Sequence, residues 1–149
     1  MSSALAVQQT NFRNDYQKVM VNIMYTSNWF QEKLKKILEQ EDITPQQFNL
    51  LRILEASGKP LSTLQIRERM LDKMSDTSRI VDRLILKKLV DKKTSTTDKR
   101  LVDVTINDAG KELLERLNQK NEQIDNLASG ISEDEASQLV NLLEKIRSK

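Results

Sequence analysis

Hydrophobic residues recur at every third or fourth position along the first quarter of the chain. From Phe12 to Leu38 no Gly or Pro interrupts this spacing, which predicts one long amphipathic helix within residues 8–40. Such a helix would extend about 48 Å, whereas a compact chain of 149 residues is about 38 Å across. An apolar stripe that projects beyond its own core needs a second surface, so the pattern favours dimerisation. The stripe comprises Phe12, Tyr16, Val19, Met20, Ile23, Met24, Phe30, Leu34, Ile37 and Leu38.

Capping residues predict two short helices after this element. A capping box over residues 44–47, with Pro at the first helical position, begins a helix that residues 58–60 end. A second capping box, from Ser62 to Gln65, opens a shorter helix, and residues 71–74 form the turn after it.

A third helix of this region is predicted to begin with Ser75 as its cap and to run to about Lys88. Its two faces differ in polarity, although many surface helices also carry a charged outer face. Thr77, Ile80, Val81 and Leu84 share the apolar side, and Ser75, Asp76, Arg79, Asp82, Arg83 and Leu86 share the other.

A small basic hairpin is predicted directly after that helix. Val90 and the alternating β-branched residues of 102–106 flank a polar loop over residues 94–99. Two short helices, a polar helix and a hairpin, in this order, are typical of a winged helix-turn-helix. Lys92, Lys93, Lys99 and Arg100 all belong to the hairpin.

The last part of the chain is predicted to be helical. Thr105 and Asp108 form a variant capping box that begins a helix ending at Gly130, with a break in its apolar stripe near residues 120–121. A further capping box, over residues 132–135, begins the final helix.

The expected fold class is therefore mainly α with a small β-hairpin wing. Residues 44–106 would form the winged helix-turn-helix lobe. The long helices of residues 8–40 and 107–149 would form the dimerisation region of a single chain spanning 1–149.

Composition narrows the chemistry that the chain can perform. The sequence contains no Cys and no His, which excludes disulfides, thiolate metal sites and the commonest general base. We therefore expect no cofactor and no metal site. No apolar run is long enough to cross a bilayer, and residues 1–16 lack the features of a secretory signal, so we expect a cytoplasmic protein without a membrane partner.

The charge is unevenly distributed along the chain. Residues 59–105 contain 12 Lys or Arg and 7 Asp or Glu, a balance of +5, whereas the remainder contains 12 and 15, a balance of −3. A basic centre within an acidic frame favours a polyanion as partner, although a solvated basic surface would show the same balance.

Four runs of residues resemble the MarR family of bacterial transcriptional regulators. They are similar to the family's T-R-x-V-D-R-L, G-L-V, D-x-R and L-T-x-x-G runs, and the element order matches over nearly the whole chain. The runs in this sequence are residues 78–84, Leu89–Val90, Asp98–Arg100 and residues 105–110.

The resemblance implies a homodimer that binds a pseudo-palindromic operator on double-stranded DNA and acts as a transcription regulator, a repressor in our leading interpretation. It also implies a recognition helix in the major groove, a wing in the minor groove, and control by a small-molecule effector. One residue departs from the family, because Lys88 occupies the position of the Gly before Leu-Val. If this position needs a positive φ, Lys88 carries backbone strain; otherwise the turn differs.

The strongest candidate for DNA binding is Arg100, since a guanidinium at a wing tip can enter the narrow minor groove. Asp98 is expected to orient Arg100 or to fix the loop. Arg79 and Ser78 lie near the start of the recognition helix, where side chains meet base edges. Asp76 could accept a hydrogen bond from cytosine, or its negative charge could interact favourably with the helix dipole. The further candidates are Ser75, Lys99, Lys73, Arg83, Lys92 and Lys93, mostly as phosphate contacts, with Arg83 and Asp82 also expected as braces.

Aromatic residues offer a candidate ligand pocket between the first helix and the lobe, where the resemblance places effectors. Core or dimer packing is the alternative use of these side chains. The residues are Tyr25, Trp29, Phe30 and Phe48.

Two other function classes compete with the regulator. A winged-helix protein-interaction module could use the same basic surface to bind an acidic partner without reading a DNA sequence. An enzyme would need a reactive pair, but Glu133 with Glu135 and Asp98 with Asp103 fall at predicted caps and hairpin positions. The sequence also lacks a Gly-rich phosphate loop, so we expect no enzymatic activity.

Overall fold

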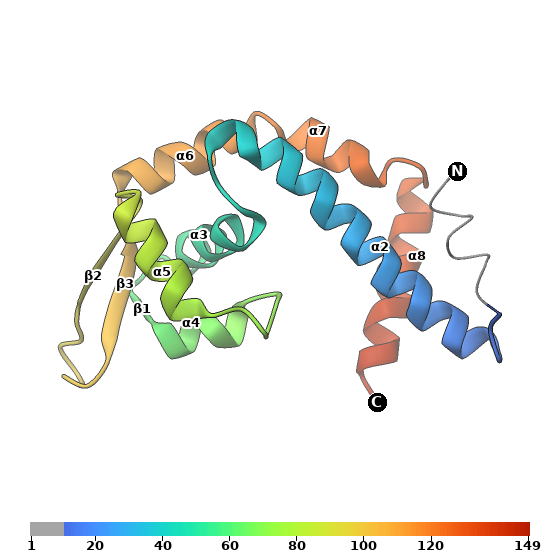
Figure 1. The fold of residues 1–149 in the computed structure, drawn as a ribbon, viewed down its shortest axis with the longest axis horizontal. Helices are drawn as coiled ribbons and strands as arrows, with labels where there is room; N and C mark the ends of the chain where they lie inside the picture. The colour runs from blue at the N-terminus through green and yellow to red at the C-terminus, as the bar shows by residue number, and fades with distance from the viewer. Residues whose placement is uncertain (1–10) are drawn as a thin grey trace.

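The computed structural model describes residues 11–149 and is mainly helical with a small antiparallel sheet, as predicted (Figure 1). Two predictions lie partly outside the described residues. They concern residues 8–10 of the predicted first helix and most of residues 1–16, where no secretory signal is expected. The elements are α2 (Asp15–Leu38), η1 (Glu39–Glu41), α3 (Pro45–Ser57), β1 (Leu61–Ser62), α4 (Thr63–Arg69), α5 (Thr77–Leu86), β2 (Val90–Thr94), β3 (Val102–Ile106), α6 (Asp108–Asn118), α7 (Asn121–Asp125), η2 (Asn126–Ala128) and α8 (Glu133–Arg147).

Helix α2 is shorter than its hydrophobic pattern predicts. The pattern begins at Phe12, but the helix begins at Asp15 because the Asn14 side chain accepts a hydrogen bond from the Gln17 N–H at 2.9 Å. Its 24 residues span about 36 Å. Within α2, burial is confined to Ile37 and Leu38, so most of its apolar stripe remains exposed.

The capping boxes that begin α3, α4 and α8 are confirmed. Two other predicted caps are wrong by one or two residues. Ser75 donates its backbone N–H to the turn at Asp72, and Asp76 caps α5 instead. Thr105 is paired within the sheet, so Asn107 caps α6 by accepting from the Gly110 N–H at 3.0 Å.

The predicted hairpin is confirmed, and it is joined by a third strand that the sequence did not reveal. The strand order is β1-β3-β2 with antiparallel pairing throughout, so β2 lies at an edge of the sheet. Leu61 pairs with Val104, and Lys92 pairs with the same residue from the other side. A strand of two residues is too short to show an alternating pattern.

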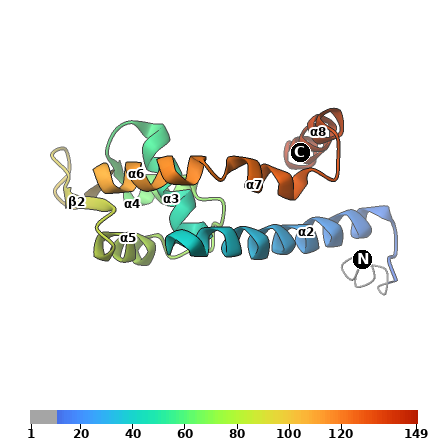
Figure 2. The same cartoon turned by 90° about the horizontal axis from the view of Figure 1, so that it is seen from above.

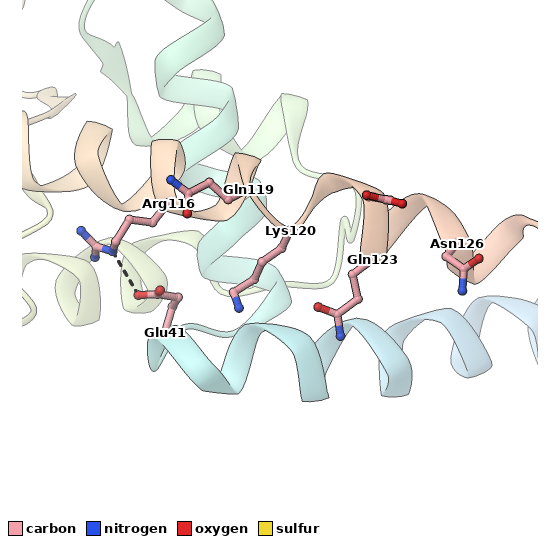
Figure 3. A pocket seen from close by; sticks show the side chains of 7 residues that line it. Glu41, Arg116, Gln119, Lys120, Gln123 and Asn126 are labelled. Atoms are coloured by element: carbon pink, nitrogen blue, oxygen red, sulfur yellow. Dashed lines mark hydrogen bonds and ion pairs between the residues drawn. The ribbon is translucent and has the colours of Figure 1, made fainter.

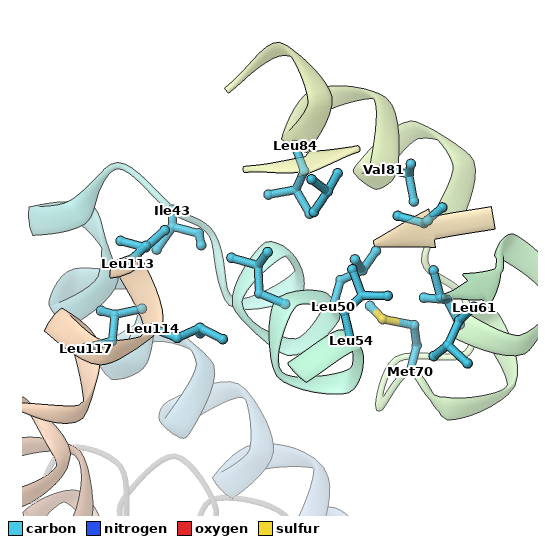
Figure 4. Packing of buried hydrophobic residues seen from close by; sticks show 14 of the residues in the cluster. Ile43, Leu50, Leu54, Leu61, Met70, Val81, Leu84, Leu113, Leu114 and Leu117 are labelled. Carbon is cyan, nitrogen blue, oxygen red and sulfur yellow. The ribbon is translucent and has the colours of Figure 1, made fainter. Parts of the chain in front are cut away.

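One hydrophobic core holds the lobe together around α3 (Figure 4). Leu50, Leu51 and Leu54 of α3 are at most 2% exposed. The core also includes residues of α6, which the sequence analysis placed in the dimerisation region. The α6 contribution is Leu113, Leu114 and Leu117, each buried. Helix α6 is therefore anchored to the lobe by its apolar face.

The helix predicted to run to Gly130 is divided into α6, α7 and η2, at the break that its apolar stripe indicated. Figures 1 and 2 show α2 and the α6–α7 segment extending from the lobe, with α8 crossing near the far end of α2. The two ends of the chain thus form arms outside the lobe core.

Lys88 has a positive φ of 61°, which is the first of the two alternatives that the departure from the family Gly left open. Its backbone N–H donates to Ile85 O at 2.9 Å, and the Leu89 N–H donates to Leu84 O at 3.0 Å. These two bonds form a Schellman motif, which ends helix α5 and turns the chain into β2. A residue with a Cβ is strained in this conformation.

Lys88→Gly should therefore raise the free energy of unfolding by about 1 kcal/mol, because glycine adopts positive φ without steric cost. Urea denaturation followed by circular dichroism would measure the change. Lys88→Ala is the matched control, since it removes the same charge but keeps the Cβ. An equal gain in both variants would assign the effect to charge rather than to the backbone.

Candidate nucleic-acid interface

Helix α5, the expected recognition helix, presents a polar face to solvent and an apolar face to the core. Thr77, Val81 and Leu84 are at most 5% exposed, which confirms the predicted inner face. Ser78, Arg79 and Arg83 are exposed on the outer face. Ser75 differs from the other candidates, because its Oγ atom is buried.

Asp76 acts as the N-cap of α5. Its carboxylate accepts a hydrogen bond from the Arg79 N–H at 3.2 Å. This contact fixes the first turn of the helix and so sets the position from which Arg79 extends. A hydrogen bond from Asp76 to a DNA base stays a prediction.

The wing tip carries a bidentate pair between Asp98 and Arg100. Arg100 donates from Nε to Oδ1 at 3.1 Å and from Nη2 to Oδ2 at 3.0 Å, and its backbone N–H also donates to Oδ1 at 3.0 Å. The Arg100 side chain remains 89% exposed. Asp98 therefore orients an arginine that is otherwise free to contact a ligand, as the sequence indicated.

Charge on both partners strengthens this pair. Hydrogen bonds from the Arg100 side chain and backbone hold the pKa of Asp98 below its ordinary value, and Asp98 raises the pKa of Arg100. A carboxylate with a lowered pKa stabilises the fold above its ordinary pKa, and the effect is lost as pH falls through the lowered value. The brace on Arg100 is therefore intact at neutral pH.

An ion pair links the wing to the recognition helix. Lys92 Nζ of β2 lies 3.5 Å from Asp82 Oδ1 of α5. Both side chains are largely exposed, so the pair contributes little stability, but it connects the two elements expected to contact DNA. Asp82 was expected to act as a brace, and Lys92 is the partner that the sequence did not identify.

The remaining lysine candidates lie at the surface of the lobe. Lys73 Nζ donates to the Glu68 carbonyl and so covers the end of α4. Lys93 and Lys99 are exposed. In Figure 1, the N-terminal end of α5 and the wing tip both lie toward the lower edge of the lobe.

Comparison with known proteins agrees with this geometry. The model of the MarR family matches residues 41–101, which contain α3 to β2 and the wing loop. A mutant of Escherichia coli MarR in complex with operator DNA superposes with a TM-score of 0.83 at 22% identity, covering 92% of this chain and 99% of that one. The winged lobe belongs to the MarR family. The resemblance found in the sequence is thereby confirmed.

Two further relatives have a higher percentage identity over the part of the chain that they match. The HTH-type transcriptional repressor MdtR of Bacillus subtilis strain 168 is 32% identical over 80 residues, which are 54% of this chain and 51% of the relative. The alignment thus spans about half the length of that curated relative. The Staphylococcus aureus MepR–DNA complex has a TM-score of 0.73 at 26% identity, covering 93% of this chain and 98% of that one.

The aromatic residues predicted to form a ligand pocket are used in two places. Trp29 and Phe30 make an edge-to-face contact on α2, with ring centroids 5.2 Å apart. Phe48 packs against the lobe core, and the Arg52 guanidinium lies 5.0 Å from the centre of its ring. These contacts are packing contacts, and the pocket stays a prediction.

A polar cavity of about 730 Å³ lies where the end of α2 meets α6 and α7 (Figure 3). Glu41 and Arg116 form an ion pair across it at 3.3 Å. The sequence did not indicate this cavity, because its polar residues look like ordinary surface positions until the fold brings them together. Its lining is Glu41, Arg116, Gln119, Lys120, Glu122, Gln123 and Asn126.

Within residues 11–149, none of the helices combines the length and apolarity that crossing a lipid bilayer requires.

Proposed function

We propose that this chain is a sequence-specific transcriptional regulator that binds double-stranded DNA, acts as a repressor, and works as a homodimer on a pseudo-palindromic operator. The observation that carries the proposal is the exposed Arg100 held by Asp98 at the wing tip of a lobe whose recognition helix exposes Arg79. A braced guanidinium suits the minor groove, and an arginine in the first turn of a recognition helix suits a guanine edge.

The relatives support the same proposal. MdtR is described as a repressor, and the MarR and MepR structures contain DNA. The basic balance of residues 59–105 agrees with a polyanion as partner of the lobe.

The homodimer is supported by apolar side chains on the two arms. Tyr16, Met24 and Leu142 are 86%, 62% and 58% exposed, and a largely apolar hollow of about 540 Å³ separates α2 from α8. Exposed apolar surface of this extent marks an interaction site, and a second copy of the same arms would cover it.

The effector is proposed to bind the polar cavity beside Glu41 and Arg116. This cavity lies between an arm and a helix anchored in the lobe core, so a bound ligand could change the spacing of the two recognition helices. The Glu41–Arg116 pair would then be the contact that the ligand replaces.

Selection of bound duplexes from a random pool tests the function. We expect two related half-sites with centres about 34–36 Å apart, one turn of B-form DNA. Binding should survive excess random duplex, and the logarithm of affinity should fall by about 0.9 per neutralised phosphate for each logarithmic unit of salt. Equal affinity for all duplexes would instead favour a protein-interaction module.

Arg79→Ala should weaken operator binding about fivefold and relax the base preference at one position of each half-site. The loss follows from removing a bidentate contact to guanine. The loss of base preference is measured by determining the affinity for a set of operators, each changed at one position. Arg83→Ala, one turn further along α5, is the control. A uniform loss across all sequences would assign Arg79 to a phosphate.

A further inference from the structure

A second feature of the lobe surface lies beside the start of the recognition helix. A hollow of about 430 Å³ opens between α4 and the first residues of α5. Leu64 and Met74 line it, although they are 58% and 92% exposed. The rest of the lining is polar, so Leu64 and Met74 supply the apolar contact area in an otherwise polar part of the proposed DNA surface. The polar lining residues are Thr63, Arg67, Ser75, Asp76, Thr77 and Ser78.

The turn before α5 holds Met74 in this exposed position. The Met74 N–H donates to Asp72 Oδ1 at 2.9 Å, and the Leu71 N–H donates to Asn49 Oδ1 at 3.0 Å. The Ser75 N–H donates to Asp72 O at 3.2 Å. Because the backbone is fixed on both sides of Met74, its side chain is presented to solvent by a defined turn.

The walls of the hollow also contain hydroxyl groups without partners. Ser75 Oγ and Thr77 Oγ1 are buried and make no hydrogen bond within residues 11–149, and Thr77 is 5% exposed. Both residues line the hollow. Because both oxygen atoms are buried, they lie beneath the surface of the hollow, and its exposed apolar contacts are those of Leu64 and Met74.

We propose that this hollow receives the 5-methyl group of a thymine in each operator half-site, with Met74 and Leu64 as the specificity-determining contacts. This inference rests on the proposed function. In the major groove, thymine presents a methyl group beside the O4 acceptor, and its paired adenine presents the N7 acceptor. Cytosine has a hydrogen in place of the methyl group, so the hollow distinguishes A·T from G·C at that position.

The size of the effect follows from the burial of one methyl group. Transfer of a methyl group from water to an apolar contact changes an equilibrium constant about fourfold. The unbranched, polarisable Met side chain can adapt to the methyl group. Thymine preference at this position should therefore be moderate.

Replacing each thymine of the selected operator by deoxyuridine, one position at a time, tests the proposal. Deoxyuridine lacks the methyl group but keeps the same pairing and the O4 acceptor. The chain of residues 1–149 should lose about fourfold in affinity at one thymine of each half-site. Met74→Ala should bind the thymine and deoxyuridine duplexes equally.

Leu71→Ala is the matched control, since Leu71 is 86% exposed in the same turn but does not line the hollow. It should keep the full sensitivity to the methyl group. The proposal is overturned if no methyl group matters or if the sensitivity survives in Met74→Ala. A chain that selects no DNA sequence at all would overturn the proposed function itself, and this inference with it.

Discussion

Leu142→Glu is expected to convert the proposed homodimer into a monomer and to lower operator affinity about a hundredfold or more. Leu142 lines the hollow between α8 and α2 together with Ile23 and Leu139. A carboxylate there would lose its hydration when a second copy covers the surface, and this cost opposes association. Without the dimer, the two lobes no longer bind one operator as a linked pair.

Sedimentation and fluorescence anisotropy with the selected operator would measure the two losses. Asn141→Glu introduces the same side chain one residue earlier, at an exposed position that does not line the hollow. This control should remain dimeric and bind normally. A Leu142→Glu variant that stays dimeric would show that α8 is not part of the interface.

Arg100→Ala is expected to weaken operator binding about tenfold while leaving helicity and dimerisation unchanged. The side chain is 89% exposed, and within residues 11–149 its hydrogen bonds are made to Asp98, so we expect the fold not to depend on it. The loss arises because the minor groove would no longer receive a guanidinium, and because Asp98 would bring an unpaired negative charge to the DNA.

Lys99→Ala is the neighbouring control for this variant. It removes one exposed positive charge from the same loop and should reduce affinity less. Asp98→Asn should fall between the two, since it loosens Arg100 without removing it. Unchanged affinity in Arg100→Ala would exclude the wing tip from the interface.

Features that depend on neighbouring residues could be predicted from the sequence. The capping boxes at Thr44, Ser62 and Ser132 need contacts three residues apart, and all three are present. The caps of α5 and α6 were misplaced because Ser75 and Thr105 are used by a turn and by the sheet. The preference of Ser75 and Thr105 for capping a helix was thus overridden by tertiary contacts that the sequence pattern does not reveal.

The same distinction applies to the candidate site. The Asp98–Arg100 pair spans two residues and could be inferred from the sequence alone. The Lys92–Asp82 contact and the Glu41–Arg116 contact join residues far apart in the chain. These contacts become visible once the strand register of the wing and the packing of α6 are fixed.

The position of β2 at the rim of the sheet also bears on solubility. An uncovered strand can pair with the same strand of another molecule and begin aggregation. Asp91, Lys92 and Lys93 are exposed on this strand, so charged side chains would have to lose hydration if two such strands paired. These charged side chains can thus discourage self-association of the sheet when the protein is free of nucleic acid.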